Sequence, residues 1–223
     1  MALPKNIGVL FDYNGVIVND ESLQKDAFRS VLNGKGVKLT DQLYSEIFLG
    51  RTDIEGFEEV RGRFPQELFE VTTYELCNLK TRKYIKSLVG NKVIYDGAIE
   101  CIKSLSEQFS LGIVTSSAKK EFEAVMVKFT LRKYFSIILT AEDFKRGKPD
   151  PEPYAKGTRE LGTELKKTIA IEDSPSGVRS AKSAGIWCIA VLNTSASDQL
   201  TEADLIVNTI SEISVKTISS LLR

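Results

Sequence analysis

The sequence predicts an α/β fold in which a parallel β-sheet, with helices on both of its faces, is interrupted by a block of helices. Two observations lead to this prediction. Short apolar segments alternate with amphipathic helical segments over residues 95–221, a pattern typical of right-handed βαβ units and a parallel sheet. No period-two alternation occurs between residues 18 and 89, where the apolar spacing is helical. We therefore expect a core with an inserted α-helical cap.

The first strand is expected at residues 7–11, which form a continuously apolar run of the kind found in buried parallel strands. Asp12 follows at the carboxyl end of this strand. Ligands of open α/β sheets bind in the crevice beyond these ends. Asn14 and Gly15 favour a tight turn and a close approach of the backbone to a ligand. Asp12 is therefore placed where the chemistry of such folds takes place.

The inserted block is expected to contain helices wherever apolar residues recur at helical spacing. Thr40 is expected as an N-cap, since its hydroxyl can accept from a free backbone N–H. Gly50, Arg51 and Thr52 should interrupt the helices with a loop. The expected helices span residues 21–32, 41–48, 53–63 and 66–88.

Strands and helices alternate through the rest of the chain. A proline near the start of the helix expected at residues 151–161 is tolerated there. Strands are expected at residues 111–115, 137–140, 168–171, 187–192 and 205–207, and helices at residues 98–108, 119–129, 151–161, 174–184 and 210–221. The sequence thus predicts a core domain formed by residues 1–16 and 90–223 and a cap domain formed by residues 17–89.

The composition is that of an ordinary globular protein. The 223 residues are 42% hydrophobic and 27% charged, which suffices for one sizeable core with an inserted module. Thirty basic and thirty acidic side chains give no net charge, which argues against nucleic-acid or membrane partners. No apolar run reaches about 18 residues, and the three widely spaced cysteines suit reduced thiols. We expect a cytoplasmic protein.

Four stretches place groups that bind phosphate or metal at or near strand ends and helix starts, in a fixed order. They are IGVLFDYNGV at residues 7–16, IVTS at 113–116, GKPDP at 147–151 and IAIEDS at 169–174. This ordered set resembles the haloacid dehalogenase superfamily, and the last two stretches are similar to its β-phosphoglucomutase and phosphoglycolate phosphatase branch. The resemblance covers nearly the whole chain. It implies a Rossmann-like core and a cap that closes over the active site and excludes water.

The resemblance also implies roles for individual residues. Asp12 would attack a phosphoryl group to form an aspartyl-phosphate, and Lys148 would supply positive charge to that group. Thr115 and Ser116 would bind the phosphate. Arg51 would contact a second anionic group of the substrate, although a solvated arginine at a helix end is nearly as common. The chain has no histidine, which excludes histidine bases and histidine zinc sites.

A divalent cation is needed where a phosphoryl group meets a carboxylate, because the two repel each other. Mg²⁺ suits a few carboxylates together with phosphate and water. The resemblance implies that Asp12, Asp173 and the backbone carbonyl of Asn14 are ligands, with Glu172 bound directly or through water. Capping of the following helix by Asp173 is an alternative that can coexist with metal binding.

One residue departs from the family pattern. The phosphatases and phosphomutases of the family carry a second Asp two positions after the nucleophile, where this chain has Asn14. That Asp transfers protons to the leaving alcohol and from water, which contributes about 10² to 10⁴ in rate. An amide cannot do this, so Asn14 should impair turnover.

Three hypotheses follow from this departure. The first is a Mg²⁺-dependent hydrolase of a small phosphorylated metabolite, either a phosphatase or an enzyme like β-phosphoglucomutase, and this is our prediction. A mutase is disfavoured because both of its half-reactions need the missing proton transfer. The second hypothesis is dehalogenase-type chemistry, and the third is a phosphate- or Mg²⁺-binding protein of the same fold with little or no activity. The sequence predicts neither the substrate nor the oligomeric state.

Overall fold

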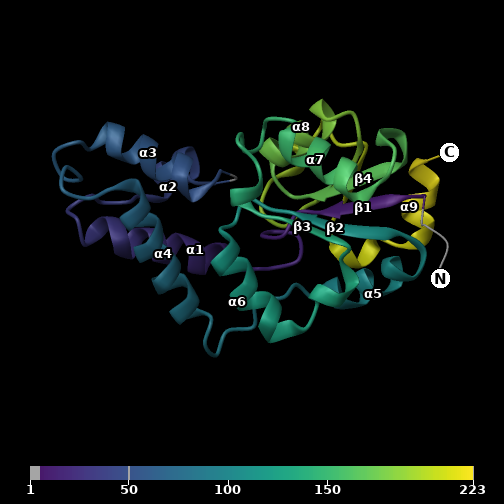
Figure 1. Ribbon diagram of the computed structural model, residues 1–223, viewed down its shortest axis with the longest axis horizontal. Coiled ribbons are helices and arrows are strands. Elements are labelled where there is room, and N and C mark those ends of the chain that lie inside the picture. Colours follow the sequence, from purple (N-terminus) through teal and green to yellow (C-terminus); the bar gives the residue numbers. More distant parts are fainter. Residues whose placement is uncertain (1–5, 50, 223) are drawn as a thin grey trace.

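The strands of the protein form one parallel sheet in the order β3-β2-β1-β4-β5-β6 (Figure 1). The structure is a computed structural model that describes residues 6–49 and 51–222. Within these residues the strands are β1 (Gly8–Phe11), β2 (Ser110–Val114), β3 (Ile137–Leu139), β4 (Thr168–Glu172), β5 (Trp187–Val191) and β6 (Leu205–Val207). The predicted α/β fold is confirmed.

Helices cover both faces of this sheet, because successive side chains of a strand point to opposite sides. Val9 and Phe11 of β1 pack into the core under α5 (Ala98–Gln108), α6 (Lys119–Phe129) and α9 (Val215–Leu221). Leu10 packs into the opposite core under α7 (Glu152–Leu161) and α8 (Pro175–Ser183). Every residue of β1 is therefore buried, which explains its continuously apolar sequence.

The inserted helices pack around an apolar cluster of their own at one end of the molecule (Figure 1). They are α1 (Glu21–Asn33), α2 (Asp41–Ile47), α3 (Asp53–Arg63) and α4 (Thr73–Ser87). The chain leaves and re-enters the sheet region through adjacent segments. The backbone N–H of Asn19 donates to Val93 O at 2.7 Å, and that of Tyr95 donates to Ile17 O at 3.1 Å.

Two predicted helices begin later than expected. Residues 65–70 form turns, and α4 begins at Thr73 because Thr72 and Glu75 exchange side-chain and backbone hydrogen bonds in a capping box. Similarly, a 3₁₀ turn at Ile210–Glu212 precedes α9, whose N-cap is Ser214. No helix among the described residues is both long and apolar enough to cross a membrane.

Candidate active site

Three buried carboxylates meet at the carboxyl ends of β1 and β4. Asp12 follows β1, Glu172 ends β4, and Asp173 comes next. Since β1 and β4 are parallel neighbours, their ends lie side by side. One carboxylate oxygen from each residue lies within 4.8 Å of the others. The structure therefore brings together the carboxylates that the sequence predicts as metal ligands.

Lys148 supplies a buried positive charge to this cluster. Its Nζ lies 2.7 Å from Asp12 Oδ1 and 2.6 Å from Glu172 Oε1, and it donates to Val114 O at 3.1 Å. Burial raises the pKa of Asp12 to about 7, because the contact with Lys148 only partly offsets the loss of solvent and Glu172 adds repulsion. Burial also disfavours the charged form of Lys148, but the two carboxylates outweigh this effect and raise its pKa.

Glu172 has both carboxylate oxygens engaged by protein donors. Oε1 accepts from Lys148 and from the Tyr154 hydroxyl at 2.7 Å. Oε2 accepts from the backbone N–H of Asp173 at 3.1 Å and from the Ser174 hydroxyl at 3.2 Å. These contacts suit Glu172 to orienting Lys148 and to contacting a cation through water.

Asp173 is held at the cavity by a different set of contacts. Its Oδ2 accepts a hydrogen bond from the Thr194 hydroxyl. The N-cap of α8 is Ser174, whose Oγ accepts from Gly177 N at 3.1 Å, so the alternative that Asp173 caps this helix is wrong. Gly15 has φ +80°, and a Cβ there would lie 1.9 Å from Asp173 Oδ2. Only glycine leaves room for the carboxylate against this turn.

The donor set at the strand ends fits a hard divalent cation. Three carboxylates share one ammonium group, and burial together with repulsion from Asp12 and Glu172 raises the pKa of Asp173 well above its ordinary range. Oxygen ligands with excess negative charge are what Mg²⁺ prefers. The side chain of Asn14 is engaged elsewhere, as described below, so its backbone carbonyl is the group it would offer to a cation.

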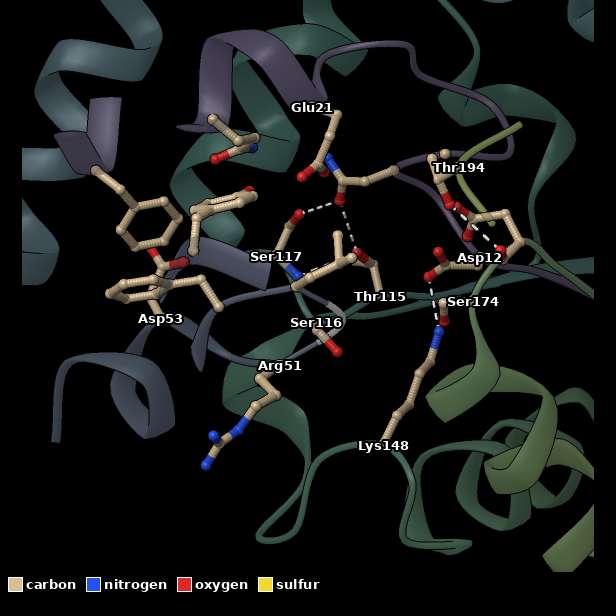
Figure 2. Close-up of a pocket in the computed structure, with 18 of the residues that line it drawn as sticks. Asp12, Glu21, Arg51, Asp53, Thr115, Ser116, Ser117, Lys148, Ser174 and Thr194 are labelled. Carbon is tan, nitrogen blue, oxygen red and sulfur yellow. Dashed lines mark hydrogen bonds and ion pairs between the residues drawn. The ribbon is translucent and has the colours of Figure 1, made fainter. Parts of the chain in front are cut away.

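The loop after β2 lines the same cavity with hydroxyl groups (Figure 2). Thr115 Oγ1 accepts from the backbone N–H of Ser117 at 3.0 Å. Ser116 Oγ is buried and has no hydrogen-bond partner among the described residues. A buried hydroxyl without a partner is costly, and a ligand oxygen would satisfy it. Thr115 and Ser116 thus lie in the same cavity as Asp12 and Lys148.

The side chain of Asn14 is fixed between two partners that sequence analysis missed. Its Nδ2 donates to both carboxylate oxygens of Asp20 at 2.9 Å, and its Oδ1 accepts from the Ser117 hydroxyl. Asp20 is buried, which raises its pKa, while hydrogen bonds from Tyr84, Asn14 and Gln24 oppose that effect. Asp20 precedes α1 and resembles a helix cap in the sequence, but its side chain makes no cap hydrogen bond.

The cap contributes charged groups to the other half of the cavity. Arg51 lines the cavity but is ion-paired with Glu59, and it points away from Asp12 in Figure 2. Gly50, in the same predicted loop, lies outside the described residues. Lys80, also missed, is buried 3.0 Å from Asp53 and 2.8 Å from a carboxylate on α6.

One sequence signal could have revealed Lys80. It lies four residues from Leu76 and four from Tyr84, so all three share one face of α4. Both neighbours are fully buried. A lysine in the apolar stripe of a helix needs a buried partner.

Comparison with known proteins identifies the family. Residues 9–191 match the haloacid dehalogenase-like hydrolases. The chain belongs to this family. It is 29% identical over 205 residues to validoxylamine A 7'-phosphate phosphatase of Streptomyces hygroscopicus subsp. limoneus, covering 92% of this chain and 94% of that protein. It is 32% identical over 182 residues to a phosphorylated carbohydrates phosphatase of Thermotoga maritima, covering 80% and 81%.

A solved structure supports the same assignment at the level of the fold. The crystal structure of β-phosphoglucomutase from Clostridium difficile matches with a TM-score of 0.83 at 19% identity, covering 96% of each chain. The resemblance predicted from the four sequence stretches is confirmed.

Proposed function

We propose that this haloacid dehalogenase-like hydrolase is a Mg²⁺-dependent phosphatase that hydrolyses a small phosphorylated metabolite through an aspartyl-phosphate on Asp12. One observation carries the proposal. The carboxylate of Asp12 lies 2.7 Å from the Lys148 ammonium, beside Asp173, in a cavity that also contains the Ser116 hydroxyl, which has no partner in the described part of the chain. The four groups that the proposal needs therefore share one cavity. They are a carboxylate to attack phosphorus, a positive charge, a carboxylate to bind the metal, and a hydroxyl to donate a hydrogen bond to the phosphate.

The first half-reaction transfers the phosphoryl group to the protein. A carboxylate oxygen of Asp12 forms a bond to phosphorus, the bond from phosphorus to the ester oxygen breaks, and the ester oxygen leaves with the bonding electron pair as an alkoxide or phenolate, an alkoxide then taking a proton from water. Lys148 offsets charge on the phosphoryl oxygens and on Asp12. A bound Mg²⁺, held by Asp12 and Asp173, would supply further positive charge to the phosphoryl group.

The second half-reaction returns Asp12 to its starting state. Water attacks phosphorus, the bond from phosphorus to the Asp12 oxygen breaks, and inorganic phosphate leaves, with the proton that the water gives up passing to a phosphate oxygen. Asn14 cannot accept that proton, and its amide group already donates to Asp20. We therefore expect the aspartyl-phosphate to form readily from esters with good leaving groups and to break down slowly.

The cap, which we assign to residues 17–89, would close this cavity. The adjacent connections near Ile17 and Val93 are the places where the chain passes between core and cap. Few backbone segments then need to change for the cap to move relative to the sheet. Closure would exclude water from the phosphoryl group during the first transfer.

The test is phosphate release with Mg²⁺ from 4-nitrophenyl phosphate and a panel of sugar phosphates. We expect a burst of about one equivalent of 4-nitrophenolate followed by slow turnover, which is the kinetic signature of a covalent intermediate. Asp12→Asn should abolish the burst. Phosphate release that survives this substitution would contradict the nucleophile assignment. Thermal stabilisation by phosphate esters without any release would instead favour a binding protein.

A further inference from the structure

We propose that the cap half of the cavity selects phosphate monoesters whose alcohol carries a protonated amine among hydroxyl groups, and that it discriminates against esters with a second phosphate. This inference rests on the proposed phosphatase function, because it concerns the leaving group of that reaction. It follows from the charges, the hydrogen-bond acceptors and the aromatic surface on the cap side of the cavity.

The cationic side chains that line the described part of the cavity are all neutralised. They are Arg51, Lys80 and Lys148. Arg51 is ion-paired with Glu59. Lys80 and Lys148 each contact two carboxylates. A second phosphate on the substrate would have to displace a buried carboxylate from Lys80 or Lys148, at a cost in desolvation and lost pairing, or compete with Glu59 for the partly exposed Arg51.

The carboxylates on the cap side outnumber these cations. Lys80 is shared between Asp53 and Glu121, at 3.0 and 2.8 Å, which leaves this cluster with one excess negative charge. Glu21 also lines the cavity, and it has no ion-pair partner among the residues that the structure describes. Figure 2 shows Glu21 and Asp53 toward the cap, away from Lys148. The field in this half of the cavity therefore favours a cationic group on the ligand.

Gln24 adds an acceptor that no donor within residues 6–49 and 51–222 satisfies. This side chain is 7% exposed and lines the cavity. Its Nε2 donates to Asp20 Oδ2 at 3.1 Å and to Glu121 Oε2 at 3.3 Å, so the opposite amide orientation would place its oxygen against two carboxylates. Gln24 Oε1 consequently remains an acceptor without a partner in the described structure. A buried acceptor of this kind calls for a ligand N–H or O–H donor.

Aromatic rings complete this surface. Phe28, Tyr44 and Phe48 line the cavity beside the carboxylates, and the rings of Tyr44 and Phe48 lie nearly parallel with centroids 6.0 Å apart. Aromatic rings attract an ammonium group, as the Lys80 ammonium 4.6 Å from the Phe28 centroid illustrates, and they also pack against the apolar faces of a sugar. A second phosphate would gain nothing from them.

The experiment compares matched esters. We would measure kcat/KM with Mg²⁺ for glucosamine 6-phosphate against glucose 6-phosphate, for 2-aminoethyl phosphate against 2-hydroxyethyl phosphate, and for glucose 1,6-bisphosphate. We expect each amine to be preferred by about tenfold or more, as for a partly buried charge-assisted contact. The bisphosphate should be disfavoured by at least a similar factor.

Substitutions test whether the lining carboxylates cause the preference for esters that carry an amine. Glu21→Gln and Asp53→Asn each remove a lining carboxylate and should reduce the amine preference, measured as the ratio of kcat/KM values within each variant, to about threefold or less. Asp26→Asn is the matched control, since it removes an exposed carboxylate from the same helix as Glu21 and should leave the preference unchanged. An equal loss of preference in the control would overturn the assignment to the cap carboxylates.

Binding separates this inference from the phosphatase proposal. Calorimetry on the Asp12→Asn variant measures affinity for glucosamine 6-phosphate and glucose 6-phosphate without turnover. Tighter binding of the amine supports the inference even if no ester is hydrolysed, in which case only the phosphatase proposal fails. Turnover without amine preference overturns the inference and leaves the phosphatase proposal standing. The absence of both turnover and binding overturns both.

Discussion

The two halves of the cavity are built around the same arrangement, a buried lysine between two carboxylates. Lys148 lies 2.7 and 2.6 Å from two carboxylates at strand ends. Lys80 lies 3.0 and 2.8 Å from two carboxylates on helices. Both ammonium groups are almost fully buried and each lies within about 5 Å of an aromatic ring centroid. The local chemistry is alike, but the surroundings differ.

The difference lies in what the surplus negative charge faces. At the strand ends a third carboxylate, Asp173, lies within 4.8 Å of the other two, and the hydroxyls of the β2 loop line the same cavity. On the cap side, Glu121 of α6 receives additional hydrogen bonds from Thr81 and Gln24, and the surplus charge of its cluster faces the part of the cavity that Asp53 lines. The first arrangement suits a metal and a phosphoryl group. The second joins α4 to α6 across the boundary between cap and core.

The largest effect is expected at Asp12. Asp12→Asn removes the proposed nucleophile but keeps the shape of the side chain, so phosphate release should fall by about 10³-fold or more. The melting temperature should stay the same or increase, because burial penalises the charged carboxylate. Steady-state kinetics and calorimetric melting check both parts. A large loss of stability together with the loss of activity would indicate a structural role instead.

The next effect compares the two lysines directly. Lys148→Met and Lys80→Met each leave two buried carboxylates without their cation, which should lower the free energy of unfolding by about 3 to 5 kcal/mol. Only Lys148→Met should also abolish turnover of 4-nitrophenyl phosphate, since only Lys148 contacts Asp12. Urea unfolding and initial rates are the measurements.

A double variant serves as the control for the cap cluster. Adding Glu121→Gln to Lys80→Met removes one of the stranded charges and should recover part of the lost stability. No recovery would mean that Lys80 contributes through its packing on Phe28 and Tyr84 and not through charge.

The same comparison explains what the sequence could predict. Asp12, Lys148 and the Glu172–Asp173 pair each lie at or near a strand end or in a marked turn, and a parallel sheet gathers such ends at one edge. The positions of these residues at strand ends in the sequence therefore predicted that their side chains cluster in the fold. Lys80 and Asp20 belong to helices and helix ends of the cap. Their partners depend on how helices pack against each other and against α6, and no sequence period specifies those contacts.

The start of α4 was mispredicted for a related reason. Helical spacing continues through residues 66–72, but the capping box formed by Thr72 and Glu75 begins the helix at residue 73. Local side-chain hydrogen bonds outweighed the apolar pattern there.

Asn14 tests the contact between the strand-end half and the cap half of the cavity, because its amide donates to the carboxylate of Asp20. Asn14→Asp would place a carboxylate oxygen where Nδ2 now lies 2.9 Å from both oxygens of Asp20. Two buried carboxylates at that distance cannot both ionise without a large penalty, so we expect the variant to be destabilised by about 3 kcal/mol at pH 8 and less at pH 5. Thermal unfolding at the two pH values is the measurement.

Exchanging the two side chains is the matched control. The double variant Asn14→Asp with Asp20→Asn restores one amide and one carboxylate in contact and should recover stability. It should also hydrolyse the aspartyl-phosphate faster than the unsubstituted protein, because residue 14 could then accept the proton. A fully stable single variant would show that Asp20 is not ionised beside Asn14.

The smallest effect concerns Asp53 and the pH dependence of stability. Burial raises the pKa of Asp53 from 3.8 to about 6, because contact with Lys80 only partly compensates and Glu121 adds repulsion. Between those values the folded protein binds more protons at this group than the unfolded chain does, so this group costs stability as the pH rises from about 4 to 6. Asp53→Asn lacks the group, and its stability relative to the unsubstituted protein should therefore rise by about 2 kcal/mol over that range. Urea unfolding of both proteins at pH 4.5 and 7 measures the difference, and a gap that stays constant would mean that Asp53 is ionised throughout and that Lys80 fully offsets its burial.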